Sequence, residues 1–278
     1  MKYIFLDNQI YIYMFERNDT EQLDKLQYLL SNNMRLVMSI ETLIEFSQSN
    51  FDQAIKLTEN VINLNPLWIE TFANIQRMEL SQFIDNNYPL KIQSVEKQIF
   101  HKDFTSLFDS KNITPLDFVN EACKNHKSKL DETNKNHQSI LKQLLTYPNN
   151  QLYNKITDNN TLNNKICKLL PQDKLNELKF TLEDKRALVK YCIDNKKLLY
   201  KDCPSIQCEH YLAKYRTTNK SRKPKLSDSK DYTISIASFP YVDYFITKDG
   251  FLFDGLKYVK KHIPKNNTEI YKSLNEIM

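Results

Sequence analysis

Glycine is so scarce in this chain that its scarcity limits the available folds and functions more than any other feature. Only two glycines, Gly250 and Gly255, occur in 278 residues, whereas glycine usually makes up about 7% of a protein. A dinucleotide-binding loop and a phosphate-binding loop each need several closely spaced glycines, because the backbone must turn tightly against the phosphates. Neither pattern occurs in the sequence, so binding of a nucleotide through a glycine-rich loop is excluded.

The composition predicts a globular chain with a sizeable core. Hydrophobic residues make up 41% of the sequence and include 16 Tyr and 15 Phe. That much aromatic surface would be costly to leave in water, so extensive disorder is not expected. The formal net charge of +5 is compatible with a polyanionic partner but does not require one.

The N-terminal segment and the cysteines predict a cytoplasmic protein without membrane contact. The first residues, MKYIFLDNQIYIYMF, place Asp7 inside an apolar run and lack a small-residue cleavage site, so they do not resemble a signal peptide. No apolar stretch reaches the roughly 18 to 20 residues that a membrane-spanning helix needs. The five cysteines lack the spacing of a disulfide scaffold, so reduced thiols are expected. Cys203, Cys208 and His210 are a weak candidate zinc set, because their spacing is loose and a fourth ligand is missing.

Two short apolar runs separated by a helical pattern predict a parallel sheet. Tyr3 to Leu6 has the pattern of a buried strand that ends at Asp7, and Arg35 to Ser39 that of a second strand. Leucines at helical spacing from Leu23 to Leu30 predict a helix between them, and Ile40 to Gln48 is predicted to form the next helix. A strand–helix–strand unit makes the two strands parallel, and ligand sites of such sheets lie at the carboxyl ends of the strands.

The middle of the chain is predicted to be helical. Apolar residues from Phe51 to Asp85 show helical spacing, and Pro66 is placed to begin a helix within this segment. Residues 89–201 are rich in Leu, Lys, Asn and Asp, with polar turn signals between helical stretches. We therefore predict an α-helical insertion over residues 89–201.

The C-terminal part returns to the sheet pattern. Tyr244 to Thr247 predicts another short buried strand, and Phe251 to Lys261 predicts the helix that follows it. We therefore predict an α/β fold. Its core comprises residues 1–88 and 202–278, with the insertion 89–201 between these two halves.

Acidic residues recur where the predicted sheet would bring them together. They are Asp7 after the first strand, Glu41 and Glu45 on the next helix, Asp228 and Asp231 at a later helix start, and Asp249 after the late strand. Two close carboxylates repel each other by about 4 kcal/mol at an effective dielectric constant near 20, so a compensating cation is expected. Mg²⁺ and Mn²⁺ prefer such oxygen ligands and activate water for phosphoryl chemistry.

At these positions the sequence resembles the PIN-like nuclease family. The matching segments are YIFLDN (Tyr3 to Asn8), SIETLIEF (Ser39 to Phe46), SDSKDYTISIASFPYVDYFITKDGFL (Ser227 to Leu252) and, more loosely, PLWIETFANIQRMELSQF (Pro66 to Phe83). The most specific segment is the strand that ends in Thr-Lys-Asp after a Pro-Tyr-Val-Asp turn. The similarity covers about half of the chain, and the insertion departs from the compact family pattern.

The resemblance implies a Rossmannoid fold with a central short-stranded parallel sheet and a metal-dependent nuclease, most simply a ribonuclease. Its substrate would be RNA or another single-stranded nucleic acid, and its cofactor Mg²⁺ or Mn²⁺. The implied catalytic and metal-binding residues are Asp7, Glu45, Asp231 and Asp249, with Asp228 as a further metal ligand. The resemblance also implies a toxin–antitoxin or phage-defence setting, in which a protein inhibitor or operon partner would bind the chain.

Several of these residues also have structural interpretations. Glu41 and Glu45 lie four positions apart on one helix face, and Glu45 is favoured because the family pattern Thr-x-x-Glu matches Thr42 to Glu45. Asp228 could cap the helix that follows it. Asp243 is expected to bind backbone amides in a turn, and Thr247 to orient Asp249 or a phosphate.

The basic stretch from Lys214 to Lys225 is the predicted nucleic-acid contact. A cationic loop beside an acidic site would offset the repulsion between that site and a phosphate backbone, although a solvated loop is the simpler interpretation. The predicted phosphate contacts are Arg216, Lys220, Arg222 and Lys223. Tyr191 and Tyr200 lie among lysines and could stack on bases, but core packing is favoured for both.

Two other functions are compatible with the sequence. A non-catalytic PIN-like scaffold would keep the fold and bind nucleic acid or a protein partner without turnover. A metal-dependent phosphatase of another α/β family would need an Asp-x-Asp motif after the first strand or clustered histidines. Asp7 is followed by Asn8 and Gln9, and the five histidines are scattered, so the phosphatase is the weaker alternative.

Overall fold

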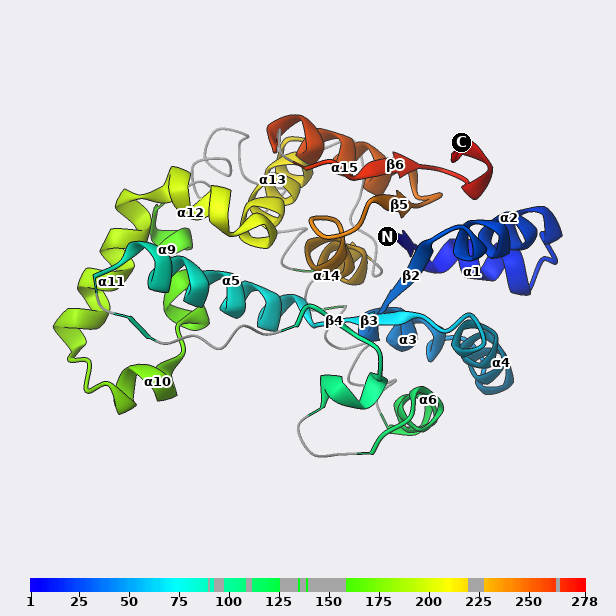
Figure 1. Ribbon diagram of the computed structural model, residues 1–278, viewed down its shortest axis with the longest axis horizontal. Helices are drawn as coiled ribbons and strands as arrows, with labels where there is room; N and C mark the ends of the chain where they lie inside the picture. The colour runs from blue at the N-terminus through cyan, green and yellow to red at the C-terminus, as the bar shows by residue number, and fades with distance from the viewer. Residues whose placement is uncertain are drawn as a thin grey trace.

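The computed structural model describes residues 1–89, 91–92, 98–108, 112–125, 135, 139, 159–219, 228–263 and 266–278. Its centre is a six-stranded sheet with the strand order β4-β3-β2-β1-β5-β6 (Figure 1). The strands are β1 (Lys2–Leu6), β2 (Met34–Ser39), β3 (Leu67–Ile69), β4 (Phe100–His101), β5 (Tyr244–Ile246) and β6 (Glu269–Tyr271). All neighbours pair in parallel except β3 and β4. The predicted α/β class with a mostly parallel sheet is confirmed.

The two ends of the sequence meet in the centre of this sheet. β1 lies between β2 and β5, so that Ile4 is paired with Leu36 on one side and with Tyr244 on the other. Asp243, just before β5, accepts a hydrogen bond from the amide of Tyr3 at 2.7 Å. The expected structural role of Asp243 is confirmed, but the amide that it binds belongs to β1 and not to its own turn.

Helices cover both faces of the sheet because both faces of its central strands are apolar. Ile4 and Leu6 pack into one core, while Phe5 packs into another on the opposite face. The first core is completed by α1 (Asn8–Phe15), α2 (Thr20–Ser31), α3 (Ile40–Phe46), α4 (Phe51–Ile62) and α6 (Pro115–Asn125). The second is completed by α5 (Phe72–Asn87), α13 (Pro204–Thr218), α14 (Asp228–Ser238) and α15 (Gly250–His262). Short 3₁₀ helices are η1 (Phe104–Leu107) and η2 (Leu274–Glu276).

A helical end extends from this sheet domain. It contains α9 (Asn159–Leu169), α10 (Gln172–Glu177), α11 (Leu182–Asp194) and α12 (Lys196–Asp202), which lie together at one end of the long axis, opposite α1 and α2 (Figure 1). These helices share a third apolar core with the ends of α5 and α13, including Leu80, Ile166 and Ile206. α5 and α13 therefore belong to both cores and connect the helical end to the sheet.

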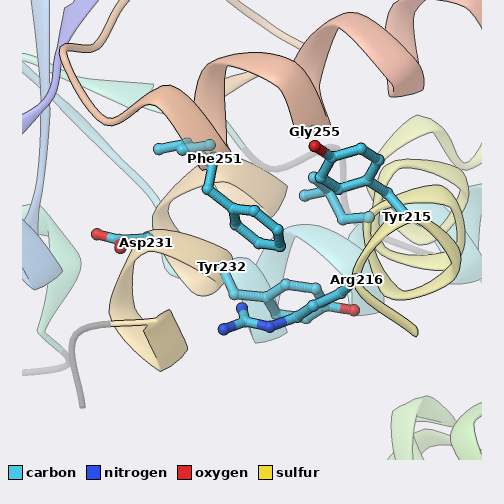
Figure 2. A pocket seen from close by; sticks show the side chains of 8 residues that line it. Tyr215, Arg216, Asp231, Tyr232, Phe251 and Gly255 are labelled. Atoms are coloured by element: carbon cyan, nitrogen blue, oxygen red, sulfur yellow. The ribbon is translucent and has the colours of Figure 1, made fainter. Parts of the chain in front are cut away.

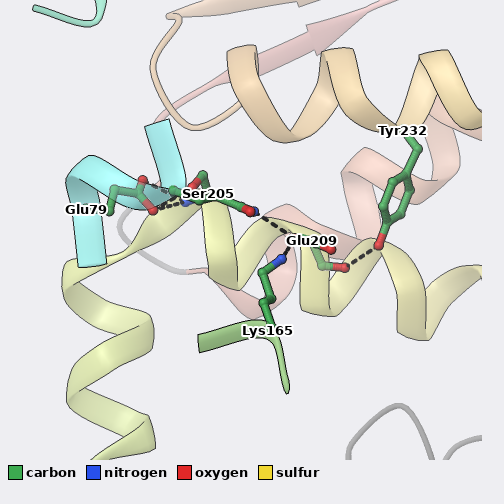
Figure 3. A network of polar contacts seen from close by, with 6 residues as sticks. Glu79, Lys165, Ser205, Glu209 and Tyr232 are labelled. Atoms are coloured by element: carbon green, nitrogen blue, oxygen red, sulfur yellow. Dashed lines mark hydrogen bonds and ion pairs between the residues drawn. The ribbon is translucent and has the colours of Figure 1, made fainter. Parts of the chain in front are cut away.

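A buried polar network fixes the start of α13 against α5 (Figure 3). Glu79 accepts hydrogen bonds from the amide of Ser205 at 2.9 and 3.2 Å and from its hydroxyl at 2.5 Å, and a further one from the Tyr241 hydroxyl. Burial raises the pKa of Glu79 to about 7 despite these hydrogen bonds. Beside it, Lys165 of α9 forms an ion pair with Glu209 of α13. The network thus ties three helices together.

The predicted helix from Phe51 to Asp85 is wrong in its middle. Leu67–Ile69 forms β3, and α5 begins only at Phe72, where Thr71 accepts a hydrogen bond from the amide of Asn74. Pro66 precedes a strand here, because a proline is also tolerated at the start of a strand. Asn65 before it adopts a left-handed conformation with a φ of 51° and turns the chain from α4 into β3. The predicted helical stretch from Ile140 to Leu145 lies outside the described residues.

No helix in the described part of the chain has the length and apolar character needed to cross a membrane.

Candidate functional site

Acidic side chains gather at the carboxyl ends of adjacent parallel strands. Asp7 follows β1 directly, Glu70 follows β3 directly, and β2 leads straight into α3, which carries Glu41 and Glu45. β5 leads through Thr247 towards Asp249. Because parallel strands end at the same edge of a sheet, these side chains share one side of the molecule.

Asp7 is held in a buried position by the start of α1 and by β5. Its carboxylate caps α1 by accepting from the amide of Asn8 at 2.8 Å, and it accepts from the Thr247 hydroxyl at 2.7 Å. Only 5% of its surface is exposed. Burial raises the pKa of Asp7 to about 6, and the nearby Asp249 raises it further against the two hydrogen bonds. Asp7 is therefore an acid that is costly to ionise, chiefly because it is buried and to a smaller extent because Asp249 is near.

Thr247 connects the two acids that were predicted from the ends of the chain. Its hydroxyl donates to Asp7 and accepts from the amide of Asp249 at 3.1 Å. Asp249 in turn caps α15 by accepting from the amide of Leu252 at 2.9 Å. The Thr247 hydroxyl therefore positions the side chain of Asp7 and the backbone of Asp249.

Glu45 is the acid most affected by its neighbours. It is buried on α3, and its Oε2 atom has no hydrogen-bond partner among the residues that the structure describes. Burial raises its pKa well above the usual range, and the carboxylates of Asp231 and Asp7 raise it further, while Lys230 lowers it. Glu45 therefore lies within electrostatic reach of two other predicted site residues.

Glu41 differs from Glu45 in the neighbours that it has. Its pKa is also raised, chiefly by burial, but the acid that adds to the shift is Glu70. Glu70 accepts from the amide of Thr71 at 2.9 Å and lies 3.5 Å from the ring of His101. Glu45 therefore faces Asp7 and Asp231, whereas Glu41 belongs with Glu70 on the β3 side of the site.

Two residues near the acids were not predicted from the sequence. Glu70 was missed although it follows the apolar strand Leu67–Ile69 in the same way that Asp7 follows β1, because that strand was interpreted as helix. Lys230 is buried on α14, with 7% of its surface exposed, and its ammonium group acts on Glu45. A lysine next to Asp231 had no sequence signal that distinguished it from the surrounding basic stretch.

Asp231 lies beside an aromatic pocket between α13, α14 and α15 (Figure 2). Tyr215, Tyr232 and Phe251 line this pocket together with Arg216, whose guanidinium lies 5.8 Å from the centre of the Phe251 ring. Arg216, one of the predicted phosphate contacts, therefore shares a pocket with a predicted metal ligand. The other predicted contacts, Lys220, Arg222 and Lys223, lie outside the described residues, and so does the side chain of Asp228.

The acidic residues influence one another without forming a compact ligand set. Among the described residues, no three His, Cys, Asp or Glu side chains are grouped so that they could hold one metal ion. This also applies to the zinc set considered from the sequence. Cys203 and Cys208 are buried, their pKa values are raised by burial, and the ring of His210 packs against Tyr200.

The two tyrosines considered as base-stacking residues have different surroundings. Tyr191 packs against Tyr88 and donates its hydroxyl to the carbonyl of Asn87 at 2.7 Å, so it is a core residue. Tyr200 packs partly against the same core but also lines a cleft with His210.

Comparison of the chain with protein-family models, curated proteins and solved structures found no match.

Proposed function

We propose that this protein is a PIN-like nuclease that uses Mg²⁺ or Mn²⁺ to hydrolyse phosphodiester bonds in RNA or another single-stranded nucleic acid. One observation carries the proposal. Asp7, directly after β1, and Glu45, on the helix that follows the adjacent parallel strand β2, each have a pKa that burial raises and that other acids of the site raise further. Keeping carboxylates this close is unfavourable without a cation, and ligand sites of parallel sheets lie at this edge.

The chemistry of the side chains suits a hard divalent ion. Asp7, Glu45, Asp231 and Asp249 would hold it, because Mg²⁺ and Mn²⁺ prefer carboxylate oxygens. The buried Oε2 atom of Glu45 would be one ligand atom, since it has no hydrogen bond within the described part of the chain. When bound, the ion supplies a Lewis acid and an activated water. Thr247 would keep Asp7 in position, and Arg216 would neutralise a backbone phosphate.

A non-catalytic PIN-like scaffold is the second candidate, and two observations favour it. The described carboxylates do not form a three-ligand group, and the buried Lys230 already places a positive charge near Glu45. Such a scaffold would bind nucleic acid or a protein partner, for example an inhibitor in a toxin–antitoxin or phage-defence operon. It would have no need for a divalent ion.

Cleavage assays on the full chain test the nuclease. Labelled single-stranded RNA, single-stranded DNA and duplexes are incubated with Mn²⁺, with Mg²⁺ or with EDTA. We expect metal-dependent cleavage of a single strand, and a loss of about 100-fold or more in Asp7→Asn and Asp249→Asn, the scale seen when a group that stabilises the transition state is removed. The matched control is Asp24→Asn, which changes an exposed carboxylate on α2. Undiminished cleavage by both site variants would refute the assignment.

Calorimetric titration separates the nuclease from the scaffold. The nuclease should bind Mn²⁺ at millimolar concentrations or below, and the Asp7→Asn variant should bind it more weakly. A wild-type chain that binds no divalent ion at millimolar concentration and cleaves none of the substrates would instead support the scaffold.

A further inference from the structure

A second cleft lies between α12 and α13, outside the acidic group. Its volume is about 650 Å³, within the roughly 300–1,000 Å³ that is usual for ligand sites. It is lined by three lysines and three aromatic rings, namely Lys196, Lys197, Lys214, Tyr200, His210 and Tyr211. This combination of cations and rings is the one that binds a phosphate and a base together.

The lysines around the cleft affect the pKa of His210. Burial lowers the pKa of His210 to about 4, and the ammonium groups of Lys196, Lys214 and Lys165 lower it further. His210 is therefore neutral at physiological pH. Among the described residues, three lysines and one acid, Asp194, line the cleft, so its formal charge is positive. An anion in the cleft would be attracted by these lysines.

A continuous series of ring contacts leads from this cleft towards the acidic site. Tyr200 contacts His210 with ring centres 5.1 Å apart, His210 contacts Tyr211 at 5.2 Å, and Tyr211 stacks on His262 at 4.8 Å. The series continues through Tyr258 and Tyr215 to Phe251, with centres 4.3, 5.6 and 5.2 Å apart. Phe251 and Tyr215 line the pocket that also contains Asp231 and Arg216.

We propose that the cleft between α12 and α13 binds one nucleotide of a single-stranded nucleic acid, with its base against Tyr200 and Tyr211 and its phosphate at Lys196, Lys197 and Lys214. The strand then follows the ring series over α13 and α15 to the acidic site. Stacking suits a single strand, because every base has a flat face that a duplex would conceal. The choice of nucleic acid as ligand rests on the proposed function, but binding in the cleft does not require cleavage.

Fluorescence anisotropy with a short labelled oligouridylate, in EDTA so that no cleavage occurs, tests the site. The Lys196→Ala/Lys214→Ala double variant should bind at least tenfold more weakly. It should also reduce the slope of log affinity against log salt by up to about 0.7, since the cleft holds one phosphate and each phosphate contact to a single strand contributes about 0.7. Tyr200→Leu, which retains apolar bulk, should weaken binding without changing the salt slope. The control is Lys56→Ala, which changes an exposed lysine on α4.

Other outcomes would overturn the inference. Wild-type affinity in the double variant would remove the cleft from the binding surface, and equally tight binding of uridine monophosphate and the oligomer would mean that the cleft binds a free nucleotide. Circular dichroism of each variant checks its folding. As a measurement on the unmodified chain, the NMR resonances of His210 should shift when the oligomer binds, and unchanged resonances would contradict the site.

The failure of this inference differs from the failure of the proposed function. If Asp7→Asn abolishes cleavage while the Lys196→Ala/Lys214→Ala variant binds normally, the nuclease stands and the cleft does not. If no cleavage is found but the same double variant loses binding, the cleft stands as part of a scaffold.

Discussion

Replacing Asp7 by Asn is expected to stabilise the metal-free protein, because the folded state makes the ionised carboxylate costly. The pKa of Asp7 rises from the ordinary value of 3.8 to about 6 on folding. At about 1.36 kcal/mol for each pKa unit, this difference corresponds to about 3 kcal/mol lost from the free energy of unfolding at pH 8. Asn removes the charge and keeps an oxygen that can accept the hydrogen bond from Thr247.

The sign of the effect depends on pH. Well below 3.8 the carboxyl is protonated in both states, and Asp7 contributes no penalty. As the pH rises through 3.8 the unfolded chain ionises first, so the wild-type chain loses stability until the folded carboxyl also ionises near pH 6. Asp7→Asn should therefore be more stable than wild type at pH 8, by up to about 3 kcal/mol, and by little at pH 4.

Urea denaturation in EDTA, followed by circular dichroism at the two pH values, measures this difference. The exposed Asp24→Asn variant should match wild type at both values. Thermal unfolding should show the same order, with a rise in Tm of roughly 5 to 10 °C for Asp7→Asn at pH 8. If Asp7→Asn were destabilised equally at both pH values, Asp7 would have a structural hydrogen-bonding role, and the argument that folding makes its ionised form costly would be refuted.

Two further predictions concern the helices that carry the site. Glu79→Ala should destabilise the protein by about 3 kcal/mol or more, because it leaves the buried amide and hydroxyl of Ser205 and the hydroxyl of Tyr241 without an acceptor. Glu79→Gln keeps an acceptor and should lower the free energy of unfolding less. Equal urea midpoints for the two variants would contradict this account. Gly255→Ala would place a methyl group 3.2 Å from the Tyr215 ring. We therefore expect the free energy of unfolding, measured by urea denaturation, to fall by about 1 kcal/mol. Unchanged stability would show that the ring moves away freely.

The central part of the fold was predictable because its strands are separate apolar runs with a polar residue at the end. β1, β2 and β5 all have this form, and Asp7 and Asp249 follow from it, whereas Glu45 was predicted from its place on the helix after β2 and from the Thr-x-x-Glu pattern. β3 could not be recognised, because three residues are too few to show a strand period and Pro66 is compatible with either element. Glu70, which follows β3, was therefore not recognised as a candidate site residue.

Other features depend on contacts between distant segments and therefore have no local signal. Lys230 resembles any other lysine of a basic stretch until α14 packs beside α3 and brings it near Glu45. The same holds for the ring series between α12, α13 and α15. Histidines and tyrosines spread over the sequence become neighbours only because α13 and α15 pack side by side.

The position of β1 between β2 and β5 also determines when the site can form during synthesis. Thr247, which holds Asp7, is 240 positions further along the chain, so a ribosome must complete most of the protein before the two residues can meet. Until then β1 has a free edge next to its pairing with β2, and such an edge is prone to pair with other chains. A fragment that stops before β5 would therefore have Asp7, Glu45 and Asp231 but neither Thr247 nor Asp249, and it would be a target for chaperones and proteases without an assembled acidic site.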